Sequence, residues 1–242
     1  MAIAEIGGQK VEDEGSDVAA RIIPYPNDVA AGSLLINVGA VWHANGVNSV
    51  TAALNSGTAT IESFTTLLGS TGVSWAGGVG KAFICYSTVI TPGSLSLIVS
   101  TNEPLNNYYQ IAIDEFSGVD STPLDVNGGE ALFGAATGVT DTISTLTANS
   151  LIIGVIVTDE AVTAFTDGSG YTNIYTDPTG TQQPSDAMFR IVTTAASYNV
   201  DWSWTGSSRS SSVINAAFKP LGGGPPGPGP IPARRLQSAW RW

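Results

Sequence analysis

Short apolar runs alternate with clusters of Gly, Asn, Asp and Pro along most of this chain. Period-two alternation between turn residues predicts β-strands, and no stretch keeps a helical period over about 12 residues. The sequence therefore predicts an all-β protein, most simply an antiparallel β-sandwich of jelly-roll or immunoglobulin-like type. Eight runs carry this prediction: 31–42, 81–90, 94–101, 108–116, 150–159, 187–195, 198–205 and 211–218.

The order of these runs repeats between the two halves of the chain. AAGSLLINVGAV (30–41) corresponds to TANSLIIGVIVT (147–158), KAFICYSTV (81–89) loosely to DAMFRIVTT (186–194), and YQIAIDEFSG (109–118) to SVINAAFKPL (212–221). One sandwich with pseudo-twofold symmetry and two similar subdomains, 29–125 and 126–220, both account for this internal pseudo-repeat. We favour one closed sandwich over 29–220, because the chain passes its midpoint without a linker-like break.

The two ends of the chain differ from the body. Residues 1–28 are expected to form an N-terminal arm, because KVEDEGSD is charged or small and the prolines of RIIPYPND favour extended backbone. Residues 221–242 combine a Gly/Pro linker with the segment IPARRLQSAWRW. Trp and Arg are enriched in binding hot spots, so we expect this tail to bind a protein partner; a frayed tail without function is the alternative. The expected contacts are Arg234, Arg235, Leu236, Trp240, Arg241 and Trp242.

Charge is unevenly distributed along the chain. Residues 1–221 hold 6 basic and 20 acidic residues, a net charge of −14, whereas the rest hold three arginines and no acid. Nucleic acid and anionic membrane surfaces require a basic footprint, so neither is expected as a partner of the body. Charged residues make up 12% of the chain, about half the usual share, which fits a structural protein better than a metabolic enzyme.

The N-terminal sequence also bears on localisation. MAIAEIGGQKVEDEG shows no basic region followed by an apolar core, so no secretory signal peptide is expected. No apolar run reaches the roughly 20 residues that span a bilayer. We therefore expect the protein to be made and folded in a cytoplasm. Cys85, the single cysteine, lies in AFICY and is expected to be a small buried hydrophobe.

Few residues are candidates for chemistry. FSGVDSTPLD (116–125) is expected to form a corner in which Asp120 caps backbone N–H groups, and a carboxylate site for calcium or glycoside hydrolysis is the alternative. Alternation places Asp114 and Glu115 on opposite faces of a strand, which disfavours a shared site. His43 is the only histidine, which excludes a metal site built mainly on imidazole. We expect no catalytic residue, no metal and no cofactor, and a glycosidase or lyase is the least favoured function.

Two tryptophans lie close together in YNVDWSWT (198–205). Trp202 and Trp204 share one face of the predicted strand, because side chains two residues apart point the same way. Such a pair fits the core of a sandwich, where aromatic side chains bury large areas. It also fits a platform for stacking sugars, with Trp75 as a third candidate, or a partner interface.

Several segments together resemble a β-sandwich family found in phage virion proteins and in large bacterial surface proteins. In that family a "gdLli" strand, a "SGvd..PlD" corner and a closing "W...g......aaFkP" strand recur. The matching segments here are AAGSLLINVGAV, AFICYSTVITPGSLSLIVST, YYQIAIDEFSGVDSTPLDV, LTANSLIIGVIV and WSWTGSSRSSSVINAAFKP, over roughly residues 29–220.

The resemblance brings no catalytic motif. It implies a non-enzymatic virion structural protein, first of all a capsid decoration or cement protein, with a head fibre or tail accessory protein as other placements. Its expected partners are the major capsid protein, other virion proteins and further copies in a homo-oligomer. The alternative function is a glycan-binding module for host or surface attachment.

Overall fold

The protein is built from β-strands and turns. The computed structural model describes residues 2–75, 77–103, 107–179 and 184–222, and no helix occurs among them. None of these residues therefore forms a helix that could cross a membrane. The all-β prediction is confirmed, and each of the eight predicted runs overlaps a strand.

The first half of the chain forms a pair of sheets, which we call the first unit. Its large sheet has the order β1-β11-β4-β9-β6. Strand β2 also pairs with β11, and strands β7 and β8 also pair with β9. Its small sheet has the order β3-β10-β5. The strands are β1 (Ala4–Glu5), β2 (Val11–Val18), β3 (Ala20–Pro24), β4 (Leu34–His43), β5 (Val50–Gly57), β6 (Thr60–Ile61), β7 (Thr65–Leu68), β8 (Val73–Trp75), β9 (Gly78–Thr91), β10 (Leu95–Thr101) and β11 (Asn107–Ser117).

The second half forms another pair of sheets, the second unit. Its large sheet has the order β12-β19-β14-β17-β16 and its small sheet the order β13-β18-β15, which match β2-β11-β4-β9-β7 and β3-β10-β5 of the first unit. The favoured single closed sandwich is therefore wrong, because each half has its own two sheets and its own core. The strands are β12 (Val119–Ala136), β13 (Gly138–Ser144), β14 (Leu151–Thr158), β15 (Ala164–Asp167), β16 (Thr172–Asp177), β17 (Ser185–Ile191), β18 (Ser197–Thr205) and β19 (Arg209–Pro220).

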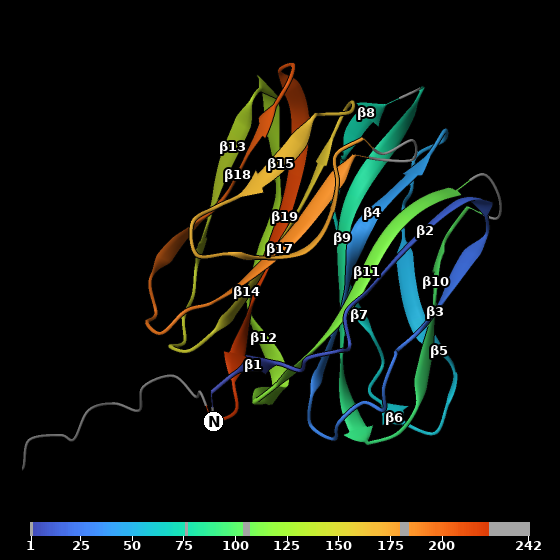
Figure 1. Ribbon diagram of the computed structural model, residues 1–242, viewed down its shortest axis with the longest axis vertical. Helices are drawn as coiled ribbons and strands as arrows, with labels where there is room; N and C mark the ends of the chain where they lie inside the picture. Colours follow the sequence, from blue (N-terminus) through green and yellow to red (C-terminus); the bar gives the residue numbers. More distant parts are fainter. Residues whose placement is uncertain (1, 76, 104–106, 180–183, 223–242) are drawn as a thin grey trace, which may run out of the picture.

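The two large sheets pack face to face, so that the molecule has four layers with the small sheets outside (Figure 1). The largest cluster of buried apolar side chains lies between the large sheets, with Ile36 and Ile84 from the first unit and Ile153 and Phe218 from the second among its members. We call this cluster the central layer. Because each large sheet is covered on both faces, every residue of β4 and β14 is buried. Such burial explains the near-continuous apolar character of these two runs.

Two aromatic contacts cross the central layer. Tyr86 meets Phe218 edge to face with ring centroids 5.1 Å apart, and Phe116 meets Phe189 in the same way at 5.1 Å. Tyr86 and Phe189 hold matching positions in β9 and β17, as do Phe116 and Phe218 in β11 and β19. The two units thus make one contact twice, as the subunits of an isologous dimer do.

The N-terminal residues do not form a separate arm. Strand β2 pairs with β11 and strand β3 pairs with β10, so both strands belong to the first unit. Val11 packs against the core of this unit, and Ile23 and Tyr25 are buried in it. Arg21 and Asp13 form an ion pair between the two strands. Charged residues are tolerated here because both strands lie at sheet edges, where charge also discourages aggregation.

The same turn precedes the central strand of each unit. Gly32 and Asn149 have left-handed backbone conformations, with φ of 74° and 59°, which glycine and asparagine adopt most readily. The next residue, Ser33 or Ser150, donates its hydroxyl to the carbonyl oxygen three residues earlier at 2.7 Å in both turns. The short segments AGS and ANS therefore build equivalent entries into β4 and β14.

The predicted corner is the connection between the two units. Gly118 has a φ of 74° and separates β11 from β12, and a Cβ there would lie 2.2 Å from the carbonyl oxygen of Ala2. Asp120 Oδ1 accepts a hydrogen bond from the Thr122 N–H at 2.9 Å, as expected for a capping residue. The Leu221 N–H donates to the Gly118 oxygen at 2.8 Å, which fixes the end of the second unit to the corner.

Removing one ring from the central layer should weaken the whole molecule. Phe218→Ala is expected to lower the free energy of unfolding by about 3–5 kcal/mol, because it opens a cavity between the two large sheets. Chemical denaturation followed by tryptophan fluorescence should show one transition, since both units share this layer. Leu146→Ala is the control, because Leu146 is 68% exposed and its loss should cost less than about 0.5 kcal/mol. Two separate transitions in the unsubstituted protein would contradict a shared central layer.

Candidate functional site

A groove lies where the two units meet at the corner, and we call it the junction groove. It consists of two adjoining cavities of about 360 and 420 Å³, which share Glu62, Thr88 and Ser121 in their walls. Together they reach the size of small-ligand or peptide sites in other proteins. Five segments that are distant in sequence form the walls: 30–33, 62–65, 86–90, 117–124 and 219–221.

The wall of the larger cavity is partly apolar and exposed. Ile90 and Leu221 are 54% and 51% exposed, and both line this cavity together with Val89 and Val119. Large apolar side chains exposed beside a concave surface are typical of binding sites. The described chain ends directly after Leu221, at Gly222.

The smaller cavity is more polar. Its walls include Thr65, Tyr86, Leu124 and Lys219. Glu62 lies at the boundary with the larger cavity. Glu62 is exposed, and it takes part in none of the ion pairs found within the described ranges. Beside the groove, hydrogen bonds from Thr122 lower the pKa of Asp120, with a further contribution from Lys219. The groove therefore presents a free carboxylate next to apolar surface.

A buried carboxylate holds one wall of the groove in place. Glu115 is fully buried, and its Oε1 accepts hydrogen bonds from the Ala30 N–H at 2.7 Å and from the Ser33 hydroxyl. Its Oε2 accepts a bond from Gln9 Nε2 at 2.7 Å. A buried polar group is costly unless it is hydrogen-bonded, and these three donors meet that need. Glu115 thereby fixes the turn at 30–33 that lines the larger cavity.

Asp114 and Glu115 point to opposite faces of β11, as the alternation predicted. The neighbours of Glu115 at 111 and 113 belong to the core of the first unit, whereas those of Asp114 at 112 and 116 belong to the central layer. Burial raises the pKa of Asp114 to about 7, against the opposing hydrogen bond from the Glu115 N–H. The two carboxylates therefore do not form a shared site.

A second carboxylate joins the two units away from the groove. Glu130 of β12 accepts hydrogen bonds from Ser70 Oγ at 2.8 Å, Thr71 N at 2.7 Å and Gly72 N at 2.8 Å in the first unit, and from Ser212 Oγ at 2.6 Å in the second. Burial alone would raise the pKa of Glu130, but these hydrogen bonds outweigh it and lower the pKa. The contact ties the edge strand β12 to the turn at 69–72.

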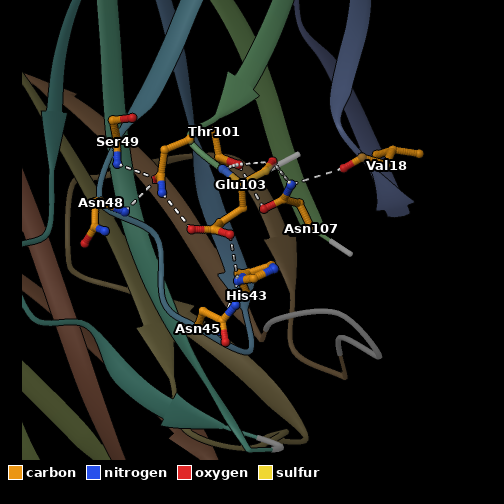
Figure 2. Close-up of polar contacts among 9 residues, drawn as sticks. Val18, His43, Asn45, Asn48, Ser49, Thr101, Glu103 and Asn107 are labelled. Carbon is orange, nitrogen blue, oxygen red and sulfur yellow. Dashed lines mark hydrogen bonds and ion pairs between the residues drawn. The ribbon is translucent and has the colours of Figure 1, made fainter. Parts of the chain in front are cut away.

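The only histidine belongs to a polar cluster at the end of β4 (Figure 2). His43 Nδ1 accepts a hydrogen bond from the Asn45 N–H at 3.0 Å and lies 3.8 Å from Glu103 Oε2. Asn102 Nδ2 donates to Glu103 Oε1 at 2.8 Å, and Asn102 Oδ1 accepts from the N–H groups of residues 48 and 49. These bonds close the loop after β4 against the end of β10, so His43 is a buried, packed residue at the end of the strand.

The second unit contains a carboxyl pair that the sequence did not predict. Asp186 of β17 is fully buried and hydrogen-bonds to Asp167, which is 19 positions earlier. Burial and the nearby Asp167 carboxylate raise the pKa of Asp186 well above its usual value, because two carboxylates in contact cannot both ionise readily. Trp202 Nε1 donates to Asp186 Oδ2 at 2.8 Å and Asn173 Nδ2 to Oδ1 at 3.0 Å.

Trp202 and Trp204 are not available for stacking sugars. They are 2% and 5% exposed and belong to the core of the second unit. Their N–H groups are also occupied, since Trp204 Nε1 donates to the Ser207 oxygen at 3.3 Å and Trp202 to Asp186. The core interpretation of this pair is confirmed, and the glycan-stacking interpretation of these two residues is wrong, because their ring faces pack against apolar neighbours.

A third cavity, of about 370 Å³, lies on the small sheet of the second unit. The cavity is lined mainly by polar residues and glycines of β13, β15 and β18, among them Gly138, Thr140, Thr166, Asp167, Asp201, Trp202 and Ser203. The outward side chains of this sheet are almost all hydroxyls, amides or carboxylates. Such a surface can bind polyols through hydrogen bonds, without aromatic stacking.

Other candidates fall outside the described part of the chain or have no reactive character. The tail residues Arg234, Arg235, Leu236, Trp240, Arg241 and Trp242 and the side chain of Trp75 lie outside it. Burial raises the pKa of Cys85 to about 12, so this thiol is a small buried hydrophobe, as expected. Within the described ranges, no group of three or more His, Cys, Asp or Glu side chains could hold a metal ion.

Comparisons with protein-family models, with curated proteins and with solved structures found no match to this chain.

The buried Asp114 should make stability depend on pH. A carboxyl group whose pKa is raised by folding stabilises the native state fully below its unfolded pKa of about 4, and this contribution is lost as the pH rises through about 7. The free energy of unfolding should therefore fall as the pH rises from 4 to 7, by at most about 1.4 kcal/mol per pH unit from this group. Asp114→Asn should remove this part of the fall. Urea denaturation at several pH values measures this slope.

Asp120→Asn is the control of opposite sign, because the pKa of Asp120 is lowered and its contribution grows as the pH rises through its acidic range. A pH profile of Asp114→Asn identical to that of the unsubstituted protein would show that Asp114 does not titrate as inferred.

Proposed function

We propose that this protein is a non-enzymatic structural protein of a virion, and most specifically a decoration or cement protein that stabilises a phage capsid. The observation that carries the proposal is the four-layer stack, in which both large sheets are covered on both faces. Such a body is a rigid block whose interior is committed to packing. In this proposal it is made in the host cytoplasm and works in the virion without a cofactor.

The outer face of the first unit supports a contact role. Its outward side chains include no charge: Ala20, Ile22, Pro24, Thr51, Ala53, Ser56, Ser96, Ile98 and Ser100. Ile22 of the edge strand β3 is 55% exposed on this face and pairs with Ile98 of the central strand β10. Cores of protein interfaces are depleted in charged residues, so a flat uncharged face suits contact with a neighbouring protein.

The segments that resemble the virion family occupy the parts of the fold that create the stack. These segments form the strands β4 and β14 at the centre of the large sheets, and the strand β19. They also form the corner that connects the two units. In the proposal the body sits on the particle surface, and the Arg- and Trp-rich tail fastens it to the major capsid protein, to other virion proteins or to sister copies. Nucleic acid and membrane are not proposed as partners, because the body carries a net charge of −14.

The proposal predicts binding to assembled shells. Purified full-length protein should sediment with shells of the source particle prepared without it, with saturable stoichiometry, and should raise the temperature at which the shells open. Deleting residues 223–242 should reduce the bound fraction at least tenfold while the circular dichroism spectrum is unchanged. Arg209→Ala serves as the matched control, because it removes a surface arginine of the body that pairs with Glu160 at 2.6 Å. Full-length protein that stays in the supernatant would overturn the proposal.

The third cavity favours glycan binding as a second candidate function. Its hydroxyls and the Asp201 carboxylate are the groups that recognise sugar hydroxyls by hydrogen bonding. This candidate predicts saturable, salt-tolerant binding on a glycan array that Asp201→Ala reduces at least tenfold. Thr51→Ala, on the outer sheet of the first unit, is the matched control and should leave binding unchanged. An array with no bound glycan would remove this candidate and leave the virion proposal untouched.

A further inference from the structure

The described chain ends inside the wall of the junction groove. Leu221 lines the larger cavity and its N–H is bonded to the Gly118 oxygen, so the exit point of the chain is fixed at the corner between the units. Beyond Gly222 the sequence continues for 20 residues with three arginines, two tryptophans and no acid. A binding groove and a segment with the composition of an interface anchor therefore lie next to one another along the chain.

The chemistry of the groove matches that of the segment. Exposed Ile90 and Leu221 offer apolar surface for an indole ring, which buries on the order of 150–250 Å² when it packs. Exposed Glu62, at the boundary of the two cavities, offers a carboxylate for a guanidinium group, the pair that gives bidentate hydrogen bonds. The body as a whole carries −14 and the segment +3, so long-range attraction also favours this contact.

The linker decides which copy the segment reaches. GGGPPGPGP (222–230) holds four prolines, and where such a linker is extended its nine residues span roughly 25 Å. In that extended form the linker would carry residue 231 well beyond the groove from which the chain emerges, and binding to the chain's own groove would require a reversal of its direction. A neighbouring copy at that distance meets the anchor without such a reversal.

We propose that the junction groove of one copy binds residues 231–242 of a second copy. Reciprocal exchange of the two tails closes a dimer with twofold symmetry, the commonest arrangement of soluble oligomers. This inference rests on the proposed function, because it identifies a sister copy as one partner of the tail. The indole of Trp240 or Trp242 packs on Ile90 and Leu221, and an arginine of the segment pairs with Glu62.

The test uses two full-length variants that break opposite halves of the contact. Ile90→Asp places a charge in the groove and leaves the tail intact, and the side chain is exposed, so the fold is preserved. The double substitution Arg235→Ala and Trp240→Ala breaks the tail and leaves the groove intact. Sedimentation velocity is expected to show a dimer for the unsubstituted protein and at least tenfold weaker association for each variant alone.

Mixing the two variants separates a sister copy from the chain's own groove. An equimolar mixture restores association through one intact tail and one intact groove, and fluorescence transfer between labelled variants reports it. Leu132→Asp is the matched control, because Leu132 is 52% exposed and lines neither cavity of the groove. It should associate as the unsubstituted protein does. Glu62→Gln should weaken association severalfold and reduce its dependence on salt concentration.

Three results would overturn the inference. They are a monomeric unsubstituted protein, an Ile90→Asp variant that associates normally, and a mixture that does not regain association. If the tail binds the groove of its own chain, the unsubstituted protein is monomeric, and chemical cross-links between tail and groove form within one chain only. The shell-binding assay is separate: if Ile90→Asp and the unsubstituted protein bind shells equally through the tail, the proposed function stands and only the sister-copy groove fails.

Discussion

The face-to-face packing of the two large sheets is the constraint on which the rest of the molecule depends. A sheet that is covered on one face can alternate apolar and polar side chains, whereas a sheet covered on both faces must be apolar throughout. The chain nearly meets this demand in β4 and β14, where every position is buried and all residues but Asn37, His43 and Thr158 are apolar or glycine. The paired edge-to-face contacts of Tyr86 with Phe218 and of Phe116 with Phe189 then fix how one unit sits on the other. The junction groove follows from this packing, since its walls come from both units.

Three buried or half-buried carboxyl groups inside this stack have hydrogen-bond partners. Glu115 receives three hydrogen bonds, and Glu130 receives four from two different units. Burial and contact with Asp167 raise the pKa of Asp186, which accepts bonds from Trp202 and Asn173. Buried carboxylates add little net stability, but removing their partners is costly. Their effect here is to fix positions: Glu115 sets one wall of the groove, and Glu130 sets β12 against the first unit.

The sequence predicted the strands that lie inside sheets and missed those at the edges. All eight predicted runs are strands with a partner on each side or at the centre of a small sheet, whereas β2, β3, β5, β7, β12, β13, β15 and β16 pair on one side only. Edge strands are less buried, so their hydrophobic pattern is weak, and the charged segment KVEDEGSD shows no strand pattern for this reason. The four-layer arrangement was missed because a continuous apolar run does not say which two surfaces cover it. The Asp167–Asp186 pair and the groove join residues far apart in sequence, and periodicity carries no information on such contacts.

Charge gives the tail and the body different roles in the proposed assembly. Two bodies with a net charge of −14 repel one another, and at physiological salt this repulsion is screened beyond about 8 Å. A linker that reaches roughly 25 Å where it is extended would allow the bodies to stay beyond that distance, where the repulsion is weak. The anchor contact in the groove is short and partly buried, so salt screens it much less. Association through a tail is therefore compatible with an acidic body, whereas direct packing of two acidic surfaces is not.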